Sequence, residues 1–431
     1  MFRLGAILAT LLLGAPLTAS AAEITRIASS FDEDDPFDLI IDVRFDRTQG
    51  RTKILREQLA GPDPETGEPR GLINATELWH KSVESRLNIN LAIGLYKDLE
   101  FSFGLPLVLQ QNDSYSFVKD TNAANSTIVN NCLNPDGSLR NTNCLESGTD
   151  VEGLFSIPYA SRRGGLGNMR FGLAYAFFNQ ANDYTKPTWV VGINYEAPTA
   201  AVRDPSLDNT ELGERGNVGD KVHKYTLYTA LSRKIGVADP YFRAHYTLPV
   251  QGPGIYSNCF NRDNDPPTLG RPENCFNGRW NRKETGIKAP RVLGFLVGSE
   301  FTAFRNNAKN QQFILDLRAM GNYVSSGRYY NEMSAALRKL LSTQSYLQVG
   351  GQVGLTAKAG EAFTLRASTS FLYNTDHVLT NERLGVPASE VESRPEDVNP
   401  NFDFRTDMVS RRIWGGESRL LQFELSALFS F

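Results

Sequence analysis

The chain has 431 residues, a net charge of −3 and a pI of about 6.0. Because Lys and Arg are not in excess over Asp and Glu, the composition argues against nucleic acid as a partner. Mean hydropathy is −0.33 and 10% of the residues are aromatic, as expected where lipid-facing residues alternate with water-facing ones. No Pro/Ser/Gly-rich linker divides the chain, so we expect one folded domain.

The N-terminal residues have the features of an export signal. Arg3 precedes an apolar run from Leu4 to Leu17, and the small residues Ala19-Ser20-Ala21-Ala22 follow. This order is typical of a cleaved signal peptide, and the mature chain should begin at Ala22 or Glu23. Beyond this point no apolar run reaches the ~18 residues that a membrane-spanning helix needs. We therefore expect an exported protein that can contact a membrane only through strands.

The first strand is expected from Phe37 to Arg47. Its apolar residues alternate with Asp38, Asp42, Arg44 and Asp46, and a period of two indicates a strand with two different faces. Since charged side chains are costly in lipid, the charged face should point inwards. The same alternation predicts strands at 87–95, 99–107, 168–177, 189–196, 222–235, 240–249, 290–301, 312–324, 345–357, 362–374 and 418–431.

The connections between these strands alternate in length. Short connections lie at 97–98, 236–239 and 358–361. The long connections, one of which should contain a short helix at 328–341, are 48–84, 111–164, 199–221, 250–289, 325–344 and 375–417. Short periplasmic turns and long extracellular loops are typical of outer-membrane barrels, whereas a secreted β-sandwich would not be expected to alternate so regularly.

The last strand combines an apolar face with an aromatic end. Leu421, Phe423 and Leu425 share one face, which continues to Phe429 and Phe431. This strand resembles the C-terminal strand of bacterial outer-membrane barrels. That resemblance implies that Phe429 and Phe431 belong to the signal that the barrel-insertion machinery reads.

Four cysteines form two closely spaced pairs in long connections. Cys132 and Cys144 lie in one polar stretch, and Cys259 and Cys275 in another. Close spacing in an oxidising compartment predicts a disulfide within each pair, on the extracellular side. A metal site is the alternative, but neither a CxxC spacing nor a nearby histidine supports it.

Three segments carry a resemblance to a known family. They are 94–106 (GLYKDLEFSFGLP), 165–175 (GLGNMRFGLAY) and 195–200 (YEAPTA). In this order they resemble the meta-pathway phenol-degradation family of outer-membrane barrels, although Asn168 replaces the usual Asp and Ala200 the usual Gly. The resemblance implies a barrel, and it implies uptake of aromatic or other small apolar compounds. It transfers no binding residue, because the matched positions are turn and strand residues.

Charged residues on the inward faces are the candidate functional residues. They mix both signs, so they either form ion pairs that make the barrel rigid or form a polar constriction that selects solutes. Eight strands give a filled barrel and sixteen or more a wide pore, so a barrel of about twelve should have a narrow passage. The candidates are Asp42, Arg44, Glu100, Arg170, Glu196, Arg243, Asp316 and Arg318.

Other possible chemistry has weaker support. Asp376 and His377 are adjacent, so on an extended chain they point to opposite sides and make a poor dyad. Neither G-x-S-x-G nor H-E-x-x-H occurs. The acidic runs 32–35 and 263–265 lack an EF-hand spacing and fit a solvated surface. We therefore expect no enzyme activity, metal or cofactor.

Together these observations predict an all-β protein, a transmembrane antiparallel up-and-down β-barrel of about twelve strands, in a bacterial outer membrane. The barrel should span 37–431, after a signal peptide at 1–22 and a short periplasmic segment at 23–36. Expected partners are outer-membrane lipid, the insertion machinery and a small solute. We expect a channel for a small aromatic or apolar solute. The alternative is a structural or docking barrel that engages another protein through its loops or periplasmic mouth.

Overall fold

The computed structural model describes residues 22–30, 38–61, 65–67, 71–130, 153–207, 215–259, 275, 280–360, 362–385 and 398–431. The acidic runs at 32–35 and 263–265, and the pair Cys132 and Cys144, lie outside the described residues. Among the described residues, none of the helices has both the length and the apolar character that a membrane span requires.

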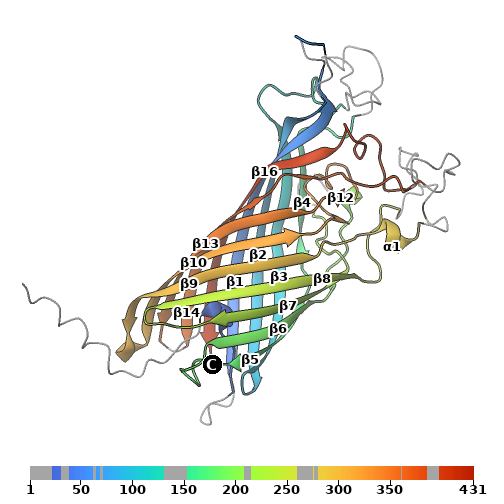
Figure 1. Cartoon of the computed structure of the whole chain (residues 1–431). Coiled ribbons are helices and arrows are strands. Elements are labelled where there is room, and N and C mark those ends of the chain that lie inside the picture. The colour runs from blue at the N-terminus through green and yellow to red at the C-terminus, as the bar shows by residue number, and fades with distance from the viewer. Residues whose placement is uncertain are drawn as a thin grey trace, which may run out of the picture.

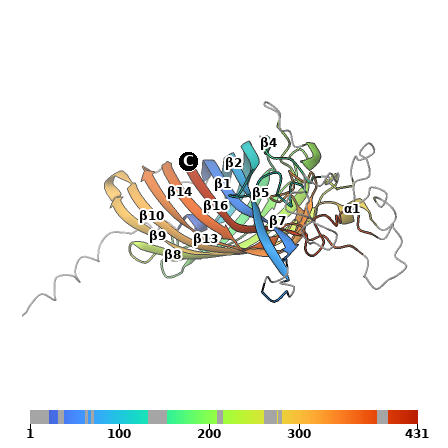
Figure 2. The same cartoon turned by 90° about the horizontal axis from the view of Figure 1, so that it is seen from above.

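Twelve antiparallel strands close into a barrel, as predicted. The first and last of them pair with each other, from Ile40 opposite Ser430 to Arg51 opposite Arg419, and Figure 2 shows red β16 beside blue β1. The strands are β1 (Leu39–Leu59), β2 (Leu72–Tyr96), β3 (Leu99–Phe117), β5 (Arg170–Phe178), β6 (Thr188–Glu196), β7 (Val222–Ser232), β8 (Ala238–Gln251), β9 (Val292–Asn306), β10 (Gln311–Val324), β13 (Tyr346–Ala359), β14 (Phe363–Asn374) and β16 (Ile413–Ser430).

The remaining elements are short, and most of them belong to the connections between barrel strands. Strand β4 pairs with β3, β11 pairs with β12, and β15 pairs with β16. Figure 1 shows α1 and the long loops at one end of the barrel and the C terminus at the other. These elements are η1 (Glu23–Thr25), β4 (Tyr159–Leu166), η2 (Pro205–Leu207), α1 (Arg282–Thr285), η4 (Asn307–Lys309), β11 (Gly327–Tyr329), β12 (Leu341–Thr343) and β15 (His377–Val378).

The two faces of the barrel wall differ in polarity. Exposed side chains on the outer face are largely apolar and include Leu173, Leu227, Phe295, Val297, Leu317, Val353, Phe371, Leu421 and Phe423. Side chains that alternate with them are buried and polar, and include Asp42, Asn88, Asp239, Asp316, Arg366, Ser368 and Ser426. A closed barrel with an apolar outside and a polar inside is the form in which strands cross the bacterial outer membrane, and the protein is located there.

The chain end is part of the barrel. The Phe431 N–H donates to the Leu39 carbonyl at 2.9 Å, and the Leu39 N–H donates to the Phe431 carbonyl at 3.1 Å. Phe429 and Phe431 both expose their side chains on the outside. Their role as a signal for the insertion machinery stays a prediction.

Three expectations about the connections are wrong. Region 111–164 is not wholly a loop, because β3 continues to Phe117 and β4 covers Tyr159–Leu166. Region 48–84 is mainly a hairpin, because β1 continues to Leu59 and β2 already begins at Leu72. This part carries polar residues on both faces, with the Arg51 guanidinium 3.7 Å from the centre of the Trp79 ring, so it lacks the apolar alternation of a lipid-facing strand. The helix expected at 328–341 is instead β11, a series of turns and β12, and Arg338 has a φ of 53° that a right-handed helix excludes.

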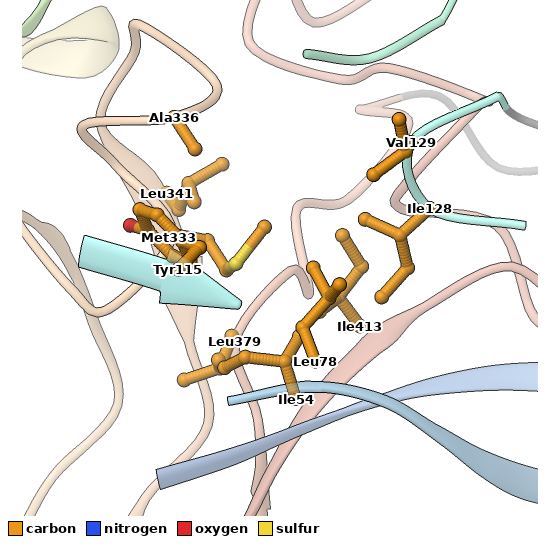
Figure 3. Packing of buried hydrophobic residues seen from close by; sticks show 10 residues of the cluster. All are labelled: Ile54, Leu78, Tyr115, Ile128, Val129, Met333, Ala336, Leu341, Leu379 and Ile413. Atoms are coloured by element: carbon orange, nitrogen blue, oxygen red, sulfur yellow. The ribbon is translucent and has the colours of Figure 1, made fainter. Parts of the chain in front are cut away.

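The extracellular loops pack against the extracellular ends of the barrel strands through a cluster of buried apolar residues. Ile54 on β1 and Leu78 on β2 share a buried cluster with the loop residues Met333 and Leu379, and Ile413 at the start of β16 belongs to it as well (Figure 3). We call this set the loop cluster; it consists of Ile54, Leu78, Tyr115, Ile128, Val129, Met333, Ala336, Leu341, Leu379 and Ile413. Its burial fixes the loops over one mouth of the barrel.

Candidate functional site

Residues 22–30, here called the inner segment, lie inside the barrel against its polar wall. The Ala28 N–H donates to Glu100 Oε2 at 2.7 Å, and the Thr25 hydroxyl is 2.7 Å from that of Ser232. Ser30 bridges to Lys97 in the turn between β2 and β3, which is one of the short turns and therefore periplasmic. Residues 23–30 of the inner segment belong to the stretch expected as a short periplasmic segment at 23–36, and the inner segment lies in the periplasmic part of the lumen.

Glu23 joins the inner segment to a buried group of charges on the far strands. Its carboxylate is 2.5 Å from the Arg318 guanidinium and also pairs with Arg366. Both arginines pair with Asp316 as well, at 2.6 Å and 2.9 Å. Tyr241 donates its hydroxyl to Asp316. We call Glu23, Asp316, Arg318 and Arg366 the ion-pair cluster; its alternating charges give each buried group a partner.

Two cavities lie in the lumen between described residues. The lower cavity, about 400 Å³, is lined by Glu23 and Arg26 of the inner segment and by inward residues of the wall, including Asp42, Arg44, Glu100 and Arg243. The upper cavity, about 430 Å³, is lined by wall residues and loop residues, including Glu84, Arg86, Pro106, Val108, Glu196, Lys224, Ile287, Val292, Tyr329 and Tyr330. The inner segment therefore forms part of the lining of the lower cavity, and loop residues form part of the lining of the upper one.

Arg170 lines both cavities. It begins β5 between Gly104 on β3 and Glu196 on β6. Gly104 has no side chain and so leaves room for Arg170. A Cβ at position 104 would lie only 2.9 Å from Asn90 Oδ1 and 3.4 Å from Arg170 Cβ. The Arg170 Nε is 4.0 Å from Glu196 Oε2, so the guanidinium is only loosely held at the boundary between the cavities.

Neighbouring charges around Arg170 are paired more closely. Glu196 also accepts from Lys224 Nζ at 2.9 Å. Arg44 is 2.9 Å from Asp42 and 3.6 Å from Glu424. Pairing of this kind lowers the cost of keeping charges in a narrow lumen and fixes where the side chains project.

The structure places the predicted lumen residues in two groups. Asp42, Arg44, Glu100, Arg170, Glu196 and Arg243 line one or both cavities. Asp316 and Arg318 belong instead to the ion-pair cluster. Sequence reasoning missed Glu23 and Arg26, since a segment of nine residues with no strand periodicity carries no local signal that it lies inside a barrel.

The remaining predicted sites have the following outcomes. Cys259 and Cys275 form the predicted disulfide. Asp376 accepts from the Glu417 N–H, whereas His377 bonds to the Thr375 carbonyl and stacks on Tyr346, so the two adjacent residues have different partners. No group of three or more metal-ligating side chains occurs in the described part of the chain.

Comparisons with known proteins give similarity of fold only. No family model and no curated protein matches the sequence. Similar solved structures include an outer-membrane channel from Pseudomonas putida F1, with 9% identity over 90% of this chain and 95% of that one and a TM-score of 0.39. A FadL homologue from Pseudomonas aeruginosa has 8% identity, coverage of 91% and 90%, and a TM-score of 0.34.

The CymD monoaromatic hydrocarbon channel has 10% identity, coverage of 90% and 88%, and a TM-score of 0.31. An outer-membrane protease from Escherichia coli is also found. At these values the neighbours carry no argument about function, which must come from the residues of this barrel.

Proposed function

We propose that the protein is an outer-membrane channel for small solutes, closed at rest by the inner segment below and by the extracellular loops above. The observation that carries the proposal is the pair of lumen cavities that share Arg170 as a lining residue. A barrel with only a structural role has no need of two such spaces along its axis. The proposal does not depend on the structural neighbours.

The inner segment is not a strand of the wall, so it can move without breaking the barrel. The inner segment contacts the wall largely through side-chain hydrogen bonds and ion pairs, such as Ala28 to Glu100 and Glu23 to Arg318. In contrast, each wall strand is held by continuous backbone pairing to both neighbours. Movement of the inner segment therefore requires the loss of a few polar contacts and not of a strand.

The cavities suit a small molecule with an apolar body. Volumes of about 400 and 430 Å³ fall at the lower end of the range for small-ligand sites. Pro106, Val108, Ile287 and Tyr329 give the upper cavity apolar surface, while Arg170 and its neighbours supply charge at the boundary. We therefore propose an aromatic or other small, largely apolar solute, in agreement with the family resemblance of the sequence.

The experiment removes three charged residues that line the lumen and measures the passage of ions and of a small solute. An Arg44→Ala, Glu100→Ala, Arg170→Ala variant should fold and should show larger or longer single-channel openings than wild type in planar bilayers. Its uptake of benzyl alcohol into proteoliposomes should also rise. Arg419→Ala is the matched control, because Arg419 lines neither cavity and is mostly exposed. A folded triple variant with unchanged conductance and uptake would favour the docking role instead.

A further inference from the structure

Three carboxylates stand side by side at the periplasmic end of the lumen. Asp239 on β8 is directly opposite Glu300 on β9, and Glu300 is directly opposite Asp316 on β10. Asp239 is only 4% exposed and Asp316 only 1%. Like charges in directly opposed positions repel, so such a row requires positive charge or donors close to each member.

Two members of the row have such partners. Asp316 pairs with Arg318 and Arg366. Glu300 accepts the Glu23 backbone N–H at 2.9 Å and lies in the field of Arg318 and Arg26.

Asp239 differs from the other two. The Ala22 backbone N–H and the Ser232 hydroxyl lie near its carboxylate, and its Oδ1 has no hydrogen-bond partner among the described residues. Lys234 acts on it through its field, and the described chain shows no direct ion pair between the two. A buried carboxylate with one unpartnered oxygen is expensive. Within the described residues, Asp239 therefore lacks a donor to Oδ1 and a directly paired positive charge.

The missing group is available from the chain itself. Ala22 is 0% exposed, and its nitrogen lies near Asp239, next to the Glu23 N–H that donates to Glu300 opposite Asp239. The signal sequence predicts cleavage beside this residue, which would turn the nitrogen into an α-ammonium with three donors. An α-amino group has a pKa of about 7.7–8.0 and is largely protonated at neutral pH.

We infer that Asp239 is the binding site for the processed amino terminus: the signal peptide is removed after Ala21, and the Ala22 ammonium pairs with Asp239 inside the barrel. In the precursor, residue 22 offers one neutral N–H. After hydrolysis of the 21–22 peptide bond it offers a charge and the missing donor. Processing therefore creates the ion pair that fixes the inner segment in the lumen. A chain that began at Glu23 would place its ammonium on Glu300 and leave Asp239 incomplete.

The first test locates the amino terminus and measures its protection. Mass spectrometry of the protein purified from outer membranes should give Ala22 as its first residue. An amine-reactive ester at neutral pH should modify the tryptic peptide 22–26 about tenfold or more slowly in the folded barrel than in the unfolded chain. Asp239→Asn should speed this modification, and Asp183→Asn, in an exposed periplasmic turn, should not. A first residue other than Ala22, or equal rates in folded and unfolded protein, overturns the inference.

The second test moves the terminal ammonium away from Ala22 and leaves the inner segment unchanged. Chains refolded into detergent would begin either at Ala22 or with Gly-Ser-Gly before Ala22, which leaves a neutral amide at that residue. The extension should lower the thermal midpoint of the barrel in the wild-type background and should have much less effect with Asp239→Asn, because the ion pair is already lost there. The same loss in both backgrounds would show that the extension acts by bulk alone, and the ammonium site would be rejected.

Discussion

At the scale of single residues, burial decides which lumen charges matter for stability. Asp316 is almost completely buried and holds two arginines, Arg318 and Arg366. Lys53 and Glu417 also form an ion pair, but Glu417 is largely exposed at the extracellular end. Loss of one partner from a buried pair leaves an uncompensated charge, whereas an exposed group is simply rehydrated.

Asp316→Asn should therefore destabilise the barrel by about 3–5 kcal/mol, because two buried guanidinium groups lose their shared carboxylate. Equilibrium unfolding in urea, followed by the gel mobility of the folded barrel in lipid vesicles, measures this loss. Glu417→Gln serves as the exposed control and should change stability little. Equal losses for the two variants would contradict the arrangement of the ion-pair cluster.

At the scale of elements, β7 shows how one strand separates lipid from lumen. Leu227 is 57% exposed on the outer face and stands opposite Ile193 and Tyr246. The next residue towards the N terminus, Thr226, faces inwards and shares a hydrogen bond of 2.8 Å with Thr247. A shift of register by one residue would exchange these two positions.

An arginine at each of these two positions tests which side chain faces lipid and which faces the lumen. Leu227→Arg places a charge against lipid near the middle of the strand and should cost about 2–4 kcal/mol, whereas lumen substitutions mainly tune selectivity. Thr226→Arg, its neighbour in sequence, should therefore fold into vesicles with a smaller loss. Folding yield and urea midpoint are the measurements. If Thr226→Arg were as damaging as Leu227→Arg, the register of β7 would be wrong.

At the scale of the whole molecule, the extracellular loops close the barrel through contacts between distant segments. Burial alone would raise the pKa of Asp403. Asp403 Oδ2 is, however, 3.2 Å from Lys339 Nζ and 3.0 Å from Arg405 Nη2, and these positive charges hold the pKa of Asp403 at about 2. Burial raises the pKa of Asp407 to about 7, against the field of Lys339 and two backbone donors.

These two carboxyl groups give the loop packing opposite dependences on pH. Asp403 has a lowered pKa, so its contribution is present above the ordinary aspartate pKa of about 3.9 and is lost as pH falls towards 2. Asp407 has a raised pKa, so its folded form keeps a proton that the unfolded form releases. Stability is therefore lost as pH rises from about 3.9 to about 7.

Asp407→Asn, which imitates the protonated form, should make the loops more stable than wild type at pH 8 and close to wild type at pH 4. Hydrogen exchange of the backbone amides at 398–412 across this range measures the difference. Asp183→Asn is an exposed control and should show no such trend. A constant difference between Asp407→Asn and wild type at every pH would rule out this titration.

The sequence alone determined the barrel and its membrane faces. Twelve stretches with apolar residues at every second position predicted the strands, and the alternation of short and long connections predicted their orientation. These signals are local and repeated many times, so an error in one strand does not change the architecture. The disulfide between Cys259 and Cys275 could also be predicted, because the two cysteines are only 16 positions apart in the sequence.

Only the tertiary structure decided what fills the barrel. Glu23 meets Arg318 across 295 residues, and Asp239 meets Ala22 only because β8 and the inner segment share the lumen. Nothing in the local pattern around Glu23 specifies this partner, since a charge next to small residues fits a free periplasmic segment equally well. The extent of the β1–β2 hairpin was likewise hidden, because a strand that leaves the lipid no longer needs an apolar face. Periodicity shows whether a strand faces lipid or water, whereas the closed interior depends on contacts between residues that are far apart in the sequence.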